Sequence, residues 1–192
     1  MKKLFVLFTV ITLALAVCGC AGGTETGGSE TTAPDKAGYD TAVSYANWSD
    51  SDDLYYSALN TSTFSISSVH HLPIYKFDTL DGLDEFKSDF GDTLTMNLGY
   101  DEIPSFNDVT AEYNEAFFKK NSLLLVYVGT SSCTYRFRVK DVIADSGCFC
   151  VNIEETTKAE AIDTAMCGWF ITVTVPDKEI KNYTEFDATL TY

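Results

Sequence analysis

Cysteine is the residue type with the most evident chemistry in this chain. In an oxidising compartment, Cys133, Cys148, Cys150 and Cys167 are first candidates for disulfides. Cys148 and Cys150 share one face of an expected strand, where a bridge between them would be strained. Cys133 and Cys167 each lie an even number of positions from residues that are expected to face the core, so both are expected to point toward the core. The sequence therefore favours a Cys133–Cys167 disulfide, with free buried thiols as an equal alternative. A metal site is disfavoured because the usual C-x₂-C spacing of zinc ligands is absent.

Histidine-dependent catalysis has little support in the sequence. His70 and His71 are the only histidines, and neighbours on a strand point to opposite faces. We interpret the pair as part of a turn ahead of Pro73. The segment "GTSSC" (129–133) lacks the second glycine of a nucleophile elbow and is also interpreted as a turn. The sequence thus predicts no catalytic residue, no metal site and no cofactor.

Three basic residues at alternate positions, Arg136, Arg138 and Lys140, predict a basic row on one face of a strand. The rest of the chain is strongly acidic, since 13 basic residues stand against 28 acidic ones and give a formal net charge of −15. That charge disfavours nucleic acid as a partner. The row is a candidate interface for a partner protein, although pairing with local acids such as Glu154 is the favoured alternative.

Residues 1–19 predict a bacterial lipoprotein signal peptide. A short basic start precedes an apolar run over 4–17 that only two threonines interrupt. This run is shorter than the roughly 20 apolar residues that a transmembrane helix requires.

Cys20 is the expected lipid attachment point. Ordinary cleavage before Val17 and lipidation at Cys18 are alternatives, but Val17 is too bulky for the position directly before an acylated cysteine. Cys20 follows the small Gly19. A diacylglyceryl group on Cys20 would anchor the protein to the cell membrane, facing the outside.

Composition divides the remainder of the chain in two. Residues 20–38 contain the lipidated cysteine and a segment without Val, Ile, Leu or aromatic residues, which predicts a flexible tether. Residues 39–192 have the size of one globular domain, of which 39–66 is a candidate N-terminal extension.

The hydrophobic pattern of 39–192 predicts an α+β fold, with a mostly antiparallel sheet of about six or seven strands and two packed helices. One helix is expected to start at Asp78 or Thr79 and to stop at Gly91, and a second is expected over 108–120. Short helices are expected within 39–59. "SLLLVYVG" (122–129) is apolar on both faces and predicts a central strand. A hairpin around Ser146-Gly147 follows it. Further strands are expected at 61–69, 74–77, 93–100, 168–176 and 185–192.

Three segments carry a resemblance to known proteins: "SSVHHLPIYKFDT" (67–79), "YNEAFFKKNSLLLVYVGTSSCTYRFRV" (113–139) and "MCGWFITVTVPDKEI" (166–180). They resemble a set of uncharacterised lipoproteins from Gram-positive gut anaerobes. More distantly, the order of elements is similar to the PrcB-type domain, which is named for a subunit of a surface protease complex. The relatives often have Ser-Gly where this chain has Ser132-Cys133. The resemblance implies no catalytic residues.

Two functional hypotheses remain. The favoured one is a non-catalytic, membrane-anchored module outside the cytoplasm that binds a partner protein or peptide. The alternative is a hydrolase whose acidic site forms only in three dimensions. A solute receptor is disfavoured because about 150 residues are too few for the two lobes that such receptors need.

Overall fold

A computed structural model describes residues 38–46, 70–91, 94, 103–145, 147–158 and 163–191, all of which belong to one compact unit spanning 32–192. The expected signal peptide, Cys20 and the tether lie outside the described residues. The strand expected at 61–69 also lies outside them, as does the strand expected at 93–100 except for the buried Leu94. Within the described part, no helix is long and apolar enough to cross a membrane.

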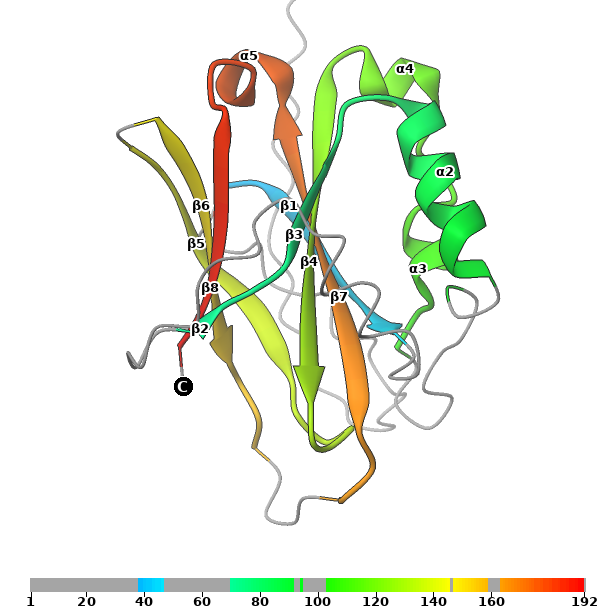
Figure 1. Cartoon of the computed structure of the whole chain (residues 1–192), viewed down its shortest axis with the longest axis vertical. Helices are drawn as coiled ribbons and strands as arrows, with labels where there is room; N and C mark the ends of the chain where they lie inside the picture. Colours follow the sequence, from blue (N-terminus) through cyan, green and yellow to red (C-terminus); the bar gives the residue numbers. More distant parts are fainter. Residues whose placement is uncertain are drawn as a thin grey trace, which may run out of the picture. The chain divides into compact units, whose positions relative to one another are not determined.

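The strands of the described part form two four-stranded sheets (Figure 1). The inner sheet is antiparallel and runs in the order β1 (Asp40–Ala46), β7 (Cys167–Pro176), β4 (Asn121–Thr130) and β3 (Ile74–Phe77). The outer sheet runs in the order β2 (His70–His71), β8 (Glu185–Thr191), β6 (Cys148–Glu155) and β5 (Phe137–Asp145). β8 is parallel to β6, and the other pairs are antiparallel. With the helices α2 (Leu80–Phe90), α3 (Phe106–Val109), α4 (Glu115–Phe118) and α5 (Asp177–Ile180), the α+β class is confirmed.

The inner sheet is the middle of three layers. β4 lies between β7 and β3, as the sequence predicts for its central strand, and its residues 122–128 are all buried. Its side chains alternate between the two faces. Leu124, Val126 and Val128 pack into the core between the sheets, whereas Leu123 and Leu125 pack with residues of the helices.

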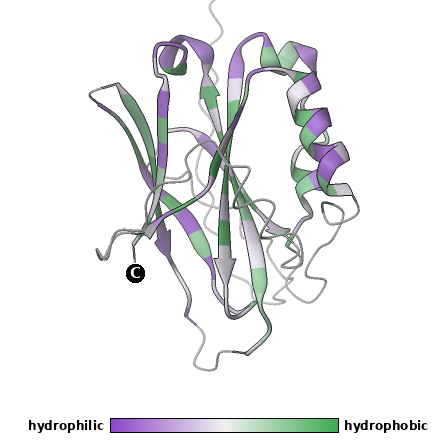
Figure 2. Cartoon of the chain, viewed as in Figure 1, coloured by the Kyte–Doolittle hydropathy of each residue, from purple (hydrophilic) through white to green (hydrophobic). Residues whose placement is uncertain are grey.

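Helix α2 covers the inner sheet on the side away from the outer sheet (Figure 1). The Thr79 hydroxyl caps it by accepting a hydrogen bond from the Gly82 N–H at 3.1 Å. Gly91, with φ at 54°, ends it. Leu83 and Phe86 are its buried residues, and the helix mixes hydrophilic and hydrophobic positions along its length (Figure 2). The first predicted helix is therefore confirmed.

The single helix predicted over 108–120 is wrong, because the chain there forms the two short helices α3 and α4. Asn114 starts a new helix, since its side-chain oxygen accepts hydrogen bonds from the Ala116 and Phe117 N–H groups at 2.8 and 3.2 Å. Such a local side-chain bond competes with a continuous helix. The short helices expected within 39–59 are wrong for Asp40–Ala46, which form β1 beside β7; residues 47–59 lie outside the described part.

The segment 70–77 joins the two sheets at a corner. The Leu72 N–H donates to the Ala188 carbonyl of β8 at 2.8 Å, whereas the Pro73 carbonyl accepts from the Tyr127 N–H of β4 at 3.0 Å. The chain therefore changes sheets at Pro73, which has no N–H to leave unpaired. His70 and His71 form β2 against β8, rather than the turn predicted from the sequence.

Candidate functional site

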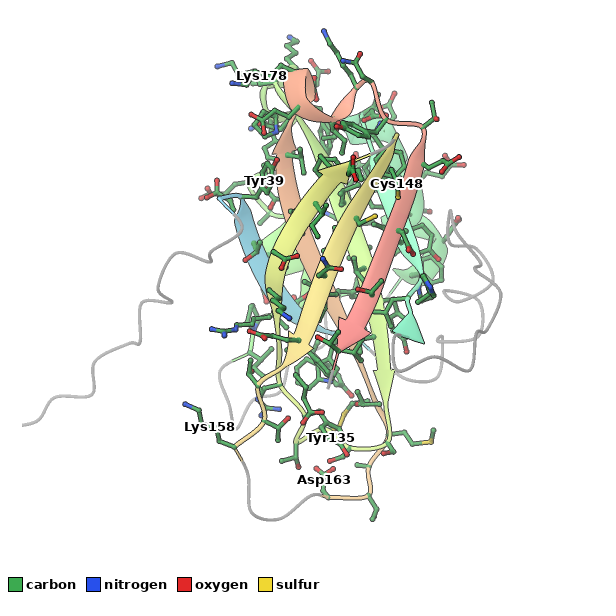
Figure 3. All side chains as sticks on the ribbon, turned by 90° about the vertical axis from the view of Figure 1, so that its left-hand side faces the viewer. Tyr39, Tyr135, Cys148, Lys158, Asp163 and Lys178 are labelled. Carbon is green, nitrogen blue, oxygen red and sulfur yellow. A yellow bond between two sulfur atoms is a disulfide. The ribbon has the colours of Figure 1, made fainter. Side chains whose placement is uncertain are left out.

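Two loops meet at one end of the sheets: the connection from β4 to β5 and the connection from β6 to β7. Figure 3 shows Tyr135 and Asp163 at this end, opposite Cys148. We call the described residues 130–136 and 163–167 the loop end. A disulfide joins Cys133 to Cys167 there, with the two Cα atoms 5.0 Å apart. This is the pairing that the sequence favours.

Asp163 adds a second link between the two loops. Its Oδ1 accepts hydrogen bonds from the Ser132 hydroxyl at 2.5 Å and from the Cys133 N–H at 3.0 Å. Its own N–H donates to the Thr134 hydroxyl at 3.3 Å. The Ser132 hydroxyl is the main cause that holds the pKa of Asp163 below its usual value. The ionised carboxylate therefore fixes one loop against the other.

The Ser132–Asp163 pair is better suited to positioning than to proton transfer. A general base works best when its pKa lies near the working pH, and the pKa of Asp163 is displaced in the opposite direction. Ser132 is also fully buried. Sequence reasoning missed this pair because its members are separated by 31 positions, and each residue type is common in turns.

The Arg136 side chain contacts both the backbone of the loop end and an aromatic ring of the core. Its Nη1 donates hydrogen bonds to the carbonyl oxygens of Cys133 and Tyr135 at 2.7 and 2.8 Å. The guanidinium carbon lies 5.2 Å from the ring centroid of the buried Trp169, a cation–π distance. Arg136 is thus committed to the loop and the core, and it precedes β5 instead of lying on it.

The predicted basic row is not continuous. Arg138 lies on the exposed face of β5 and pairs with Glu154 of β6, with Nη2 and Oε1 2.5 Å apart. The β5–β6 register shifts between Val139 and Asp141, so Lys140 lies at a bulge. Arg138 therefore forms the ion pair with Glu154 that the sequence favours over a binding site.

Large exposed hydrophobic side chains are rare in the described part: Met166 and Ile143, each with 50% of its surface exposed. Met166 belongs to the loop end, directly before the disulfide residue Cys167. Ile143 lies near the opposite end of the outer sheet, across from Cys150. A methionine side chain is flexible and polarisable, so it adapts readily to apolar partners. Met166 is therefore the exposed apolar contact that the loop end offers.

Apart from Ile143, the exposed face of the outer sheet is mainly polar, and many of its polar side chains pair with one another. Asn152 donates to Asp141 at 2.5 Å and accepts from the Thr189 hydroxyl at 2.6 Å. The His71 Nδ1 lies 2.9 Å from the Asp187 carboxylate. These hydrogen bonds order the side chains of this face, and each of the polar groups named here already has a partner within the protein.

Cys148 and Cys150 lie on the same exposed face as free thiols. Their Sγ atoms are 3.0 Å apart. Burial, followed by the hydrogen bond with Cys148 and the nearby carboxylates of Asp187 and Asp145, raises the pKa of Cys150 to about 12. A thiol with such a pKa is a poor nucleophile at neutral pH.

A second group of acids surrounds Ser122 at the end of the inner sheet near α5. The Ser122 Oγ donates to the Asp78 carboxylate at 2.7 Å and lies 3.1 Å from an oxygen of Asp177. Lys76 pairs with the other side of Asp78. These contacts link the ends of β3, β4 and β7 to one another. Because Ser122 is only 2% exposed, its hydroxyl is not accessible as a nucleophile.

Within the ranges that the structure describes, no group of three or more His, Cys, Asp or Glu side chains could hold a metal ion. Comparisons of the chain with protein-family models, with curated proteins and with solved structures find no match in any of the three.

Proposed function

We propose that this protein is a lipid-anchored module outside the cytoplasm that binds a partner protein or peptide through the loop end. One observation carries the proposal. At the loop end, the Cys133–Cys167 disulfide and the Asp163 hydrogen bonds fix two loops to each other. Met166 lies in one of these loops, and half of its surface is exposed to solvent.

The fixed geometry of the loop end favours binding. Loops lose conformational entropy when a partner orders them, and a loop that is already ordered avoids most of that cost. The disulfide and Asp163 provide this order before a partner arrives. Met166 supplies apolar area on the ordered surface, and apolar area removed from water contributes roughly 25 cal/mol per Å².

Two features support binding over turnover. The hydroxyls of Ser132 and Ser122 are both buried, and each is paired with aspartate rather than with a histidine. His71, the histidine whose side chain is described, is paired with Asp187 on the outer sheet. A nucleophile, its base and an orienting group are therefore not assembled at either serine.

The membrane location in this proposal rests on the sequence. The apolar run over 4–17 and the small Gly19 directly before Cys20 are typical of an acylated N-terminus. Two acyl chains on Cys20 hold a protein on a membrane far more firmly than one chain does.

The test compares the two half-exposed hydrophobic residues. A photo-crosslinking amino acid is placed at Met166 or at Ile143 in the full-length chain, and crosslinking is carried out on intact cells. The partner recovered through position 166 is then purified. Its Kd is measured for the unaltered protein, for Met166→Glu and for Ile143→Glu. We expect Met166→Glu to weaken binding at least tenfold, since an anchor residue of an interface contributes about 2 kcal/mol or more and about 1.4 kcal/mol is a tenfold change in Kd. Ile143→Glu should change Kd less than twofold.

Equal weakening by both variants, or by neither, contradicts an interface at the loop end. Steady hydrolysis of peptides or glycans by the purified full-length chain, lost on substitution of Asp78 or Asp177 by Asn, would instead support the hydrolase alternative.

A further inference from the structure

Cys148 and Cys150 form a pair of thiols with no partner in the core. They occupy positions i and i+2 of β6, so both side chains point away from the core that Phe149 and Val151 fill from the opposite face. Both cysteines are half-buried and free, and the two Sγ atoms lie 3.0 Å apart. The pair is separate from the loop end, and Figure 3 shows Cys148 at the other end of the sheet.

Acidic side chains flank this pair on both neighbouring strands. The β5 register places Asp145 opposite Cys148. The β8 register places Glu185 opposite Cys148 and Asp187 opposite Cys150. Residues at paired positions of adjacent strands share a face of the sheet. These carboxylates oppose further negative charge on the sulfur atoms, so an ion that binds there displaces the protons only by forming strong bonds to both sulfur atoms.

We infer that Cys148 and Cys150 bind a single soft, thiophilic metal ion in two-coordinate geometry. In this step one monovalent ion replaces two protons, and two metal–sulfur bonds form as two S–H bonds break. The oxidation state of the metal does not change, so no oxidant or reductant is required. Thiolate sulfur selects soft ions over Mg²⁺ and Ca²⁺, which require oxygen ligands.

Strand geometry favours a bridging ion over a disulfide between the same residues. Positions i and i+2 of a strand are separated by roughly 6.6 Å along the chain. A disulfide requires Cβ atoms only about 3.5–4.5 Å apart, so it would force β6 to bend. A linear sulfur–metal–sulfur unit spans roughly 4.6 Å, twice a metal–sulfur bond of about 2.3 Å. The two sulfur atoms, 3.0 Å apart without a metal, therefore have to separate by about 1.6 Å to hold such an ion.

The number of ligands also restricts the class of metal. A structural zinc site uses four protein ligands. Among the described residues, no three or more His, Cys, Asp or Glu side chains are arranged so that they could hold one metal ion together, so the neighbouring carboxylates do not complete a zinc site. Two thiolates complete the shell of a soft monovalent ion but not that of zinc.

Silver(I) is the probe of choice because it is soft and keeps its oxidation state. The full-length chain, kept without reductant so that the Cys133–Cys167 disulfide persists, is titrated with silver(I) at pH 7 beside the double variant Cys148→Ser/Cys150→Ser. The other cysteines are the same in both proteins, so the difference in binding isolates the pair. We expect the unaltered protein to bind one more silver ion per chain, with two protons released for that ion. Ca²⁺ in place of silver should show no difference.

The single variants Cys148→Ser and Cys150→Ser distinguish a shared ion from two independent thiols. A two-coordinate ion needs both sulfur atoms, so each single variant should lose as much silver binding as the double variant. Single variants that retain half of the difference, or equal binding by the unaltered and double-variant proteins, would overturn the inference. Alkylation that finds Cys148 and Cys150 blocked in the unreduced protein would also overturn it, in favour of a disulfide. Circular dichroism of every variant verifies folding.

Discussion

Removal of the Cys133–Cys167 disulfide should destabilise the fold far more than removal of the other cysteine pair. The perturbation is the double variant Cys133→Ala/Cys167→Ala. The bridge joins residues 34 positions apart, and chain-entropy theory assigns a loop of that length about 3.8 kcal/mol of stabilisation at 25 °C. That is a large part of the 5–15 kcal/mol by which domains are usually stable.

Urea unfolding followed by tryptophan fluorescence measures this effect. For an unfolding slope of about 2 kcal/mol per M, a loss of about 3.8 kcal/mol lowers the urea midpoint by about 2 M. Addition of dithiothreitol should lower the midpoint of the unaltered protein by a similar amount and should leave the Cys133→Ala/Cys167→Ala variant unchanged.

Cys148→Ala/Cys150→Ala is the matched control. It also removes two cysteines, but these are free and lie on the exposed face of the outer sheet. Changes at such positions usually alter stability by no more than about 0.5 kcal/mol. If the control lowers the midpoint as much as the Cys133→Ala/Cys167→Ala variant does, or if dithiothreitol has no effect on the unaltered protein, then the disulfide does not stabilise the fold as predicted.

Three other predictions concern single residues. Gly168→Ala should cost about 1–3 kcal/mol, because a Cβ at this position would lie 2.7 Å from the Tyr127 ring; a thermal midpoint equal to that of the unaltered protein contradicts this. Asp163→Asn should reduce the free energy of unfolding at neutral pH. Because the folded pKa of Asp163 is below its unfolded value, the stability it provides is present above the unfolded pKa and is lost as pH falls through the folded pKa. The difference between the two proteins in urea should therefore shrink in acid, and a difference independent of pH argues against the Ser132–Asp163 bond. Mass spectrometry of the mature protein should find a diacylglyceryl group on Cys20, and an unmodified N-terminus at another residue refutes lipidation.

The strongest local patterns predicted elements correctly. The apolar run that forms β4 is typical of a strand buried on both faces. Helix α2 carries its own signals, namely the Thr79 cap and the Gly91 stop, within one short segment. These features depend on neighbours in the sequence, so one sequence contains enough information to predict them.

Predictions that required a choice between local alternatives were less successful. The segment 108–120 has helical spacing of its apolar residues, but the Asn114 side chain bonds to the backbone and starts a new helix. The basic row assumed an unbroken strand, and the bulge at Lys140 changes which face each following residue occupies. A single extra residue reverses the alternation of a strand, and the sequence gives no clear sign of where it lies.

The sequence by itself determined the α+β class, the central strand, the first helix and the preference for pairing Cys133 with Cys167, because each follows from periodicity or phase within a segment. Only the tertiary structure decided that the strands divide into two sheets at the Pro73 corner, and that Asp163 reaches Ser132 from a loop 31 positions away. Those contacts depend on how distant segments meet in space, and that arrangement is set by packing of the whole core, including the layers on both faces of β4.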